Sequence, residues 1–291
     1  MSHSSTQLPQ LLETADPMRL AILNARREGR SIGLVPTMGA LHEGHLSLVQ
    51  ASVSKCDLTV VTIFVNPTQF GPGEDFGKYP RDLEADLAAL ATVSRDVLVF
   101  APSVELMYPA GYDTRVVVGA VARPLEGRCR PGHFEGVATI VLKLFQLVPA
   151  DVAFFGQKDY QQLLVIRRMV SDLNIPIRVE MCPTVRDADG LALSSRNRYL
   201  SPPQRQQALS LSRSLQLAAE LVAGGQRDPQ VVLRRMRELI QQAGDVRIDY
   251  VALADPDTLQ PVSSMDRPVL ALLAVRVGPA RLIDNGMIQP P

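Results

Sequence analysis

The sequence predicts an α/β protein in which a mainly parallel sheet, covered by helices, is followed by a smaller α+β domain. Three observations support this prediction. Short β-branched runs alternate with segments of helical periodicity as far as about residue 183. Polar segments directly follow several of the predicted strands. After residue 183 the order changes to two long helices followed by strands, which is typical of a separate α+β unit.

The predicted strands of the first domain are short, apolar and bounded by turn residues. Such runs are typical of parallel strands that are buried on both faces. They cover residues 31–36, 58–65, 97–100, 115–118, 151–155 and 177–181.

Helices are expected between these strands, because apolar residues recur there with a period of three to four. In the last of them Leu163, Ile166 and Val170 share one face. The expected helices cover residues 44–54, 83–91, 137–147 and 160–173.

The second domain is predicted to begin with two amphipathic helices, over residues 202–222 and 229–243. Each starts with a proline in the first turn, where the missing N–H costs nothing. Strands are expected at residues 247–253, 269–277 and 281–283. We therefore divide the chain into domains of residues 1–183 and 184–291.

Composition excludes several classes of protein. The 291 residues are 46% hydrophobic and 21% charged, enough apolar residues to bury a core. The formal net charge is zero, which disfavours a sequence-independent nucleic-acid binder. No apolar run approaches the roughly 20 residues of a membrane span, and no secretory signal is visible. Three widely spaced cysteines favour a reducing compartment, so we expect a cytoplasmic protein without membrane or nucleic-acid partners.

Residues 34–49 are the most informative segment. They predict a buried strand, a tight turn at Gly39 and a helix whose first turn carries His42 and His45. The two imidazoles then share one helix face beside unpaired N–H groups and the positive end of the helix dipole. Gly44 leaves room for a flat base or a ribose. This arrangement predicts a site for nucleotide phosphates. Capping or core histidines are one alternative, and a metal-binding pair is a weaker one, because no third ligand lies nearby in sequence.

Polar side chains follow two other predicted strands. Asn66 and Gln69 come after the second strand, where amides can bind a carboxylate or hydroxyls without adding charge. An ordinary Asn-Pro turn is the alternative. Lys158 follows the strand at 151–155 and can reach phosphate, with Asp159 as a helix cap and Gln162 one turn further on. A solvated lysine is the alternative here.

Ser194, Ser195 and Arg196 lie in a polar loop just after the domain boundary. Two hydroxyls and a guanidinium in succession can clamp an anion, and a lid is favoured over a plain inter-domain loop. Arg128, Arg130 and His133, in the segment before the helix at 137–147, are weaker candidates for adding positive charge to the same pocket, with an ordinary Arg-Pro-Gly loop as the alternative.

Familiar nucleotide and nucleophile motifs are missing from the sequence. No GxGxxG follows a strand, and no GxxxxGK[ST] is present. No Ser–His–Asp or Cys–His set stands out. Binding without an evident covalent nucleophile fits nucleotidyl transfer, in which positioning and electrostatic stabilisation do most of the catalysis.

Six segments, in this order, resemble the pantoate–β-alanine ligase (pantothenate synthetase) family: residues 34–49, 64–71, 79–81, 130–144, 154–162 and 187–200. The resemblance implies a Rossmann-like domain that binds nucleotide and pantoate, with His42-Glu-Gly-His45 as a HIGH-like motif, and a C-terminal lid domain. It also implies ATP-dependent condensation of (R)-pantoate with β-alanine through a pantoyl adenylate, with release of AMP and pyrophosphate. A homodimer is implied as well.

The same resemblance assigns roles to individual residues. His45 is the catalytic histidine, and His42, Lys158, Ser194, Ser195 and Arg196 help to neutralise phosphate charge. The implied nucleotide site consists of Met38, Gly39, His42, Gly44, His45, Gly156, Gln157, Lys158, Asp159, Val185, Leu193, Ser194, Ser195 and Arg196. Gln69 and Gln162 hold pantoate, and Asn66 belongs to the pantoate and β-alanine set. Mg²⁺ accompanies ATP, with Asp86 as its candidate acidic neighbour.

Three rival functions remain open at the level of sequence. A cytidylyl- or adenylyltransferase with a HIGH motif would stop at a nucleotide product, whereas the amides of Asn66, Gln69 and Gln162 favour a small hydroxy acid. A nucleotide-sensing module would bind ATP without releasing pyrophosphate. An aminoacyl-tRNA synthetase is disfavoured by the zero net charge and by the missing anticodon-binding extension.

Overall fold

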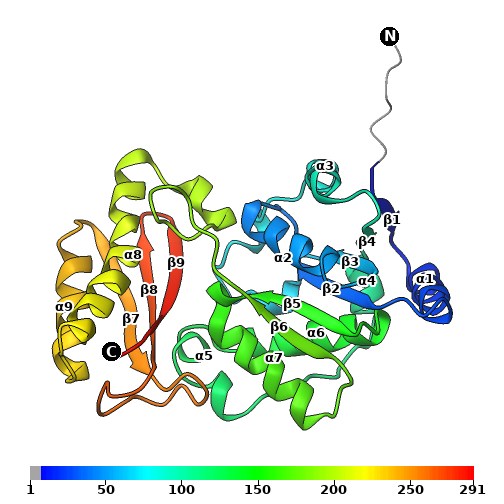
Figure 1. Cartoon of the computed structure of the whole chain (residues 1–291). Coiled ribbons are helices and arrows are strands. Elements are labelled where there is room, and N and C mark those ends of the chain that lie inside the picture. The colour runs from blue at the N-terminus through cyan, green and yellow to red at the C-terminus, as the bar shows by residue number, and fades with distance from the viewer. Residues whose placement is uncertain (1–7) are drawn as a thin grey trace. The chain divides into compact units, whose positions relative to one another are not determined.

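The computed structural model describes residues 8–291 and divides into two compact units (Figure 1). The first unit contains the described residues up to 122, with 130–156 and 162–182. The second contains residues 123–129, 157–161 and 183–291. Two short segments from the first part of the sequence therefore pack with the C-terminal residues.

A six-stranded parallel sheet forms the centre of the first unit, in the order β1-β4-β3-β2-β5-β6. Its strands are β1 (Gln10–Leu12), β2 (Ile32–Thr37), β3 (Leu58–Ile63), β4 (Leu98–Phe100), β5 (Val152–Gly156) and β6 (Arg178–Cys182). The predicted parallel α/β class is confirmed, although the sequence pattern did not predict β1.

Helices cover both faces of this sheet (Figure 1). They are α1 (Ala15–Arg27), α2 (Glu43–Val53), α3 (Leu83–Val93), α4 (Val104–Met107), α6 (His133–Leu147) and α7 (Tyr160–Asp172). Successive strand residues enter different cores: Leu34 and Val60 pack with residues of α1, α6 and α7, whereas Val35 and Val61 pack with α2 and α3. Burial on both faces explains why these strands are continuously apolar.

The prediction of a strand at residues 115–118 is wrong. These residues have no strand partner in the described structure, and the Val116 N–H donates to Thr139 Oγ1 at 2.9 Å instead. Val116 and Val118 pack against the core, while Val117 is 75% exposed. The alternation of apolar residues therefore comes from a loop that packs every second side chain on the core. Such a loop has the same sequence pattern as a strand.

The second unit contains an antiparallel sheet of β7 (Val246–Ala254), β8 (Val269–Val277) and β9 (Ala280–Ile288). Helices α8 (Pro202–Ala223) and α9 (Pro229–Gln241) pack on it through one apolar cluster. Ser201 and Gln204 form a capping box at the start of α8. The predicted order of helices and then strands is confirmed, but β9 extends well past the predicted 281–283. None of the described helices is long and apolar enough to cross a membrane.

Candidate active site

The order of the first sheet reverses between β2 and β5. From β2 the chain continues to β3 on one side, whereas β5 and β6 lie on the other. Ligands of open parallel sheets bind outside the carboxyl ends of the strands at such a switch point. The pairing of β2 with β5 covers only Gly33 and Leu34, so this ladder ends before Pro36, which cannot donate to a ladder.

A buried carboxylate holds the turn that follows β2. The chain turns through Gly39 (φ 79°) and Ala40 (φ 51°) before it enters α2. Asp86 of α3, only 4% exposed, accepts from Ala40 N at 3.1 Å and from Leu41 N at 2.7 Å. A Cβ on Gly39 would lie 2.8 Å from Asp86 Oδ2, so glycine is required both by this contact and by its positive φ. Asp86 thus has a clear structural role in this turn.

His42 and His45 are brought together at the N-terminus of α2. Their ring centroids are 4.1 Å apart, with an interplanar angle of 33°. His42 is the N-cap, and its Nδ1 accepts from Gly44 N at 3.1 Å, so this nitrogen carries no proton. The capping role that the sequence left open for a histidine therefore applies to His42. Both rings lie half-buried where the helix dipole favours an anion.

Asn66 and Gln69 belong to a short 3₁₀ turn after β3, η1 (Pro67–Gln69). The Asn66 side chain is buried, and its Nδ2 donates to Gln69 Oε1 and to Gly136 O, both at 3.1 Å. Its Oδ1 accepts from Tyr108 Oη at 2.8 Å. Gln69 Nε2 in turn donates to Met38 Sδ. The hydrogen bond between Gln69 and Met38 therefore links the segments that follow β3 and β2. The Asn66 amide fixes the Gln69 side chain through a second hydrogen bond.

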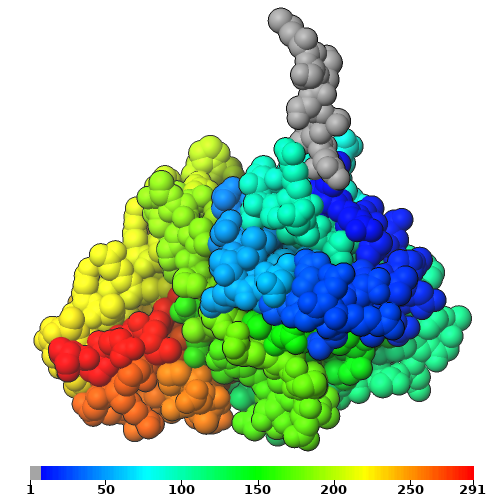
Figure 2. All heavy atoms as spheres, turned by 45° about the vertical axis from the view of Figure 1, so that its right-hand side comes forward, coloured from blue at the N-terminus to red at the C-terminus, as the bar shows by residue number. Residues whose placement is uncertain are grey.

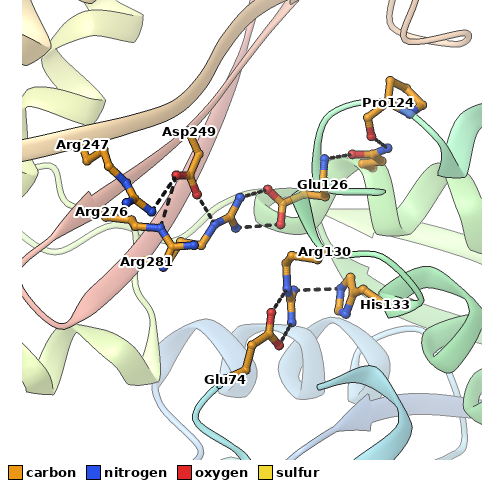
Figure 3. Close-up of polar contacts among 10 residues, drawn as sticks. Glu74, Pro124, Glu126, Arg130, His133, Arg247, Asp249, Arg276 and Arg281 are labelled. Carbon is orange, nitrogen blue, oxygen red and sulfur yellow. Dashed lines mark hydrogen bonds and ion pairs between the residues drawn. The ribbon is translucent and has the colours of Figure 1, made fainter. Parts of the chain in front are cut away.

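Arg130 and His133 support the same turn from α6 and the residues before it. Arg130 makes a bidentate ion pair with Glu74, with both N···O distances at 2.7 Å, so its charge is matched (Figure 3). Its Nη1 lies 3.0 Å from His133 Nε2. Because a guanidinium only donates, Nε2 accepts and the Nδ1 proton points to Gln69 O, 2.9 Å away. The His133 ring thereby links the Arg130 guanidinium to the Gln69 backbone.

Lys158 lies in the second unit, in the 3₁₀ turn η4 (Gln157–Asp159) that follows β5. Its side chain is 21% exposed, and Nζ lies 4.0 Å from Asp159 Oδ2. Asn285 of β9 donates to the carbonyls of both Gln157 and Lys158. Gln162, assigned to the first unit, is half-buried in the first turn of α7.

The Ser194–Arg196 segment follows a tight hairpin in the second unit. Leu193 N donates to Val185 O at 3.0 Å and closes the hairpin. Ser194 caps η5 (Ser195–Tyr199) by accepting from Arg196 N at 3.3 Å. Ser194, Ser195 and Arg196 are all half-buried.

A set of buried and half-buried charged and polar residues in the second unit was not predicted from the sequence. Arg281 of β9 donates to both oxygens of Glu126, at 2.7 and 2.8 Å, and to Asp249 at 2.7 Å (Figure 3). Asp284 and Asn285 are also buried on β9. The only signal in the sequence was a group of polar residues within an otherwise apolar strand.

Comparison with known proteins shows the family to which the chain belongs. The family model for pantoate-beta-alanine ligase matches residues 10–287. The chain is 56% identical to a pantothenate synthetase of Moorella thermoacetica over 96% of this chain and 99% of that protein. A crystal structure of the pantothenate synthetase from Thermus thermophilus has a TM-score of 0.92 and 48% identity, over 97% of this chain and 100% of that one. The Francisella tularensis enzyme, complexed with "Beta-gamma ATP" and β-alanine, has a TM-score of 0.78 and 34% identity, over 96% and 97% of the two chains. The chain therefore belongs to the pantoate–β-alanine ligase family, as the resemblance of its motifs predicted.

Proposed function

We propose that this ATP-dependent ligase joins pantoate to β-alanine through a pantoyl adenylate and releases AMP and pyrophosphate. The observation that carries the proposal is the family match across residues 10–287. It is supported by a relative whose structure holds an ATP compound and β-alanine. Within the chain, His42, His45 and Gln69 follow the carboxyl ends of adjacent parallel strands, where α/β proteins bind ligands.

Adenylation comes first, because a carboxylate is a poor electrophile whose oxide does not leave. A carboxylate oxygen of pantoate attacks the α-phosphorus of ATP, and the bond to the bridging oxygen of pyrophosphate breaks. We propose that His45 and His42, at the positive end of α2, stabilise the charge that develops on the phosphate. Lys158, Ser194, Ser195 and Arg196 are proposed to act on the same ATP.

The remaining residues of the proposed nucleotide site contact ATP without taking part in the chemistry. On the resemblance they are Met38, Gly39, Gly44, Gly156, Gln157, Asp159, Val185 and Leu193. Gly39 provides the turn that leads into α2, and Gly44 in the first turn of α2 presents backbone rather than side chain, which suits close approach to a flat base or a phosphate.

Amide formation follows. The neutral amine of β-alanine attacks the acyl carbon and loses a proton as the C–N bond forms, and AMP leaves with one former carboxylate oxygen. The mixed anhydride is sensitive to water, so a closed site favours the amide over hydrolysis. We propose that the C-terminal residues 184–291 act as the lid.

Gln69 and Gln162 are proposed to bind pantoate. The Gln69 Nε2 donates to a thioether, Met38 Sδ, which is a weak acceptor that a substrate oxygen can replace at little cost. The buried amide of Asn66 already makes hydrogen bonds through both its nitrogen and its oxygen. Its proposed contribution to the pantoate and β-alanine site is to hold Gln69 in position.

Magnesium is proposed to enter as the MgATP substrate. Mg²⁺ keeps several water and phosphate ligands and needs only one or two carboxylates. No cluster of three or more His, Cys, Asp or Glu residues that could hold a metal exists among residues 8–291. Asp86, whose carboxylate accepts from Ala40 N and Leu41 N in the turn after β2, is proposed as the acidic neighbour of the ion.

We further propose that the enzyme is a cytoplasmic homodimer that forms through its N-terminal domain. The three free cysteines suit a reducing compartment. Helix α1 lies on the surface of the first unit (dark blue in Figure 2), with Leu20 57% and Leu23 52% exposed. Light scattering should give twice the chain mass of 31.8 kDa. A value equal to the chain mass would refute the dimer.

The experiment that tests the reaction supplies ATP and pantoate with and without β-alanine and follows AMP, pyrophosphate and pantothenate. We expect AMP and pantothenate in equal amounts only when all three substrates are present. A nucleotide product without an amide would favour a nucleotidyltransferase. ATP binding without pyrophosphate release would favour a nucleotide sensor.

A further inference from the structure

We propose that Asp284 and Asn285, neighbours on β9, are positioning residues for two ATP-binding segments of the second unit. Asn285 fixes the backbone of Lys158, and Asp284 fixes the hairpin that leads into Ser194. This inference rests on the proposed roles of Lys158 and of Ser194–Arg196.

Asn285 acts purely as a donor. Its side chain is 4% exposed, and Nδ2 donates to Gln157 O at 2.9 Å and to Lys158 O at 2.8 Å. Both amide hydrogens are thus used on two consecutive carbonyls. The buried Oδ1 has no hydrogen-bond partner among the described residues. The opposite amide orientation would direct an oxygen at two carbonyl oxygens, so the chemistry allows only this one.

The two bonds matter because the Lys158 turn has little structure of its own. Only three residues, Gln157–Asp159, form the 3₁₀ turn η4. Such turns have poor hydrogen-bond geometry and depend on their surroundings. Gly156, just before the turn, is the last residue of β5 to pair with β6, so the ladder of the sheet does not extend into the turn. Asn285 therefore determines where the flexible lysine stem starts, and hence where its ammonium group can reach.

Asp284 holds the second segment through Arg186. Asp284 is 3% exposed, and its carboxylate pairs with both Nη atoms of Arg186, at 2.7 and 2.9 Å. Arg186 Nη1 also donates to Gly190 O at 3.1 Å, across the hairpin that Leu193 and Val185 close. The chain passes directly from this hairpin into Ser194, so the ion pair fixes the base of the proposed anion clamp.

Strand β9 thus contacts both the Lys158 turn and the hairpin that leads into Ser194. Asp284 and Asn285 pair with Leu273 and Leu272 of β8, and adjacent strand residues point to opposite faces. Burying polar groups is costly unless they are hydrogen-bonded, and apolar residues would pack this strand at lower cost. The Asp284 carboxylate accepts from Arg186 and from the backbone N–H of Asn285. Among the described residues, the Asn285 side chain donates only to the Lys158 turn. Alignment of these segments accounts for a polar pair at this position.

A double-mutant cycle tests the role of Asn285. Asn285→Ala is compared in the unmodified enzyme and in a Lys158→Ala background, with single-turnover pyrophosphate release from ATP and saturating pantoate as the readout. We expect a loss of about 10- to 100-fold in the first case, because a displaced ammonium no longer stabilises the transition state. In the second case we expect a change below about 2-fold, because no ammonium remains to be displaced.

Arg227→Ala is the matched control. Its side chain also donates to two backbone carbonyls of the second unit, those of Val222 and Gln226, at 2.6 and 3.0 Å. It should leave pyrophosphate release within about 2-fold of the unmodified enzyme. If Asn285→Ala does not fold, Asn285→Ser, which keeps one donor, is put through the same cycle with the same expectation of non-additivity.

The outcomes separate the positioning role from the reaction itself. Equal fold losses in the two backgrounds, or no loss in either, would overturn the positioning role. Failure of the unmodified enzyme to release pyrophosphate would overturn the proposed function, and the positioning role with it. The same cycle with Asp284→Asn and Arg196→Ala tests the second segment, and additive losses there would overturn the role of Asp284.

Discussion

At the scale of single residues, buried polar side chains hold the turns that carry the candidate ligand-binding groups. Asp86 accepts from the backbone after β2, Asn66 holds Gln69, and Asn285 donates to the backbone at Lys158. Each of them makes hydrogen bonds that order a neighbouring turn. Groups that are ordered before substrate arrives need little reorganisation during the reaction, which is where much electrostatic catalysis originates.

His45→Ala should lower the rate of adenylation by about 100-fold or more, because it removes a donor at the positive end of α2. The fold should change little, since the ring is only half-buried. Pyrophosphate release and thermal unfolding measure the two effects. Near-normal pyrophosphate release by a folded variant would contradict the catalytic role of His45.

Lys158→Ala should impair adenylation more than amide formation, because the charge on the leaving pyrophosphate develops only in the first step. Single-turnover measurements of pyrophosphate release, which reports adenylation, and of pantothenate formation, which reports the amide step, separate the two. Lys55→Ala is the control, since Lys55 makes an ion pair with Glu180 at 2.6 Å and neither residue belongs to the proposed site. Equal impairment of both steps would refute the assignment.

Glu74 makes stability depend on pH. Burial alone would raise the pKa of Glu74, but the hydrogen bonds and charge of Arg130 outweigh it, so the pKa lies below the ordinary 4.5. A lowered carboxyl pKa stabilises the fold above the ordinary pKa, and this contribution is lost as pH falls through the folded-state pKa. Glu74→Gln should therefore lower the free energy of unfolding near neutral pH, and the difference from the unmodified enzyme should shrink in acid. Urea unfolding at several pH values measures it, and a difference that stays constant would contradict the account.

At the scale of elements, the close approach of α6 to η1 fixes Gln69. A Cβ on Gly136 would lie 2.4 Å from Thr68 O and 2.7 Å from Gln69 N. Backbone atoms on both sides cannot move aside as a flexible side chain can. The same approach brings Gly136 O within reach of the Asn66 amide. The absence of a side chain at Gly136 therefore lets the Asn66 amide hydrogen-bond both to helix α6 and to Gln69 of η1.

Gly136→Ala should push η1 away from α6, raising the KM for pantoate more than that for ATP and lowering the thermal unfolding temperature. Steady-state kinetics and a thermal melt measure these effects. Gly119→Ala is the matched control, because nothing lies within 4 Å of a Cβ at that position. An unchanged KM for pantoate in Gly136→Ala would show that the position of η1 does not govern pantoate binding.

At the scale of the whole molecule, local pattern predicts the sheet of the first unit and the helices and strands that follow. Strand periodicity could not show that residues 115–118 lack a partner strand. The strand predicted from periodicity also ended at residue 283, well before the end of β9, because Asp284 and Asn285 interrupt the apolar pattern. The candidate site residues at strand ends were predictable, since parallel strands present their carboxyl ends at one edge.

The supporting residues were not predictable, because their partners lie far away in sequence. Arg281 and Glu126 are separated by 155 positions, and Asn285 and Lys158 by 127. Residues 123–129 and 157–161, which contain Glu126 and Lys158, belong to the second unit. Periodicity in a single sequence indicates contacts between residues that are close along the chain, so it cannot predict such pairs.

The central claim is that pantoate is activated as an adenylate, and oxygen transfer tests it most directly. Pantoate labelled with ¹⁸O in its carboxylate is converted with ATP and β-alanine, and AMP is examined by mass spectrometry. The account predicts one labelled oxygen in AMP, since the bridging oxygen of the adenylate comes from pantoate. Unlabelled AMP, or label in inorganic phosphate together with ADP, would contradict it.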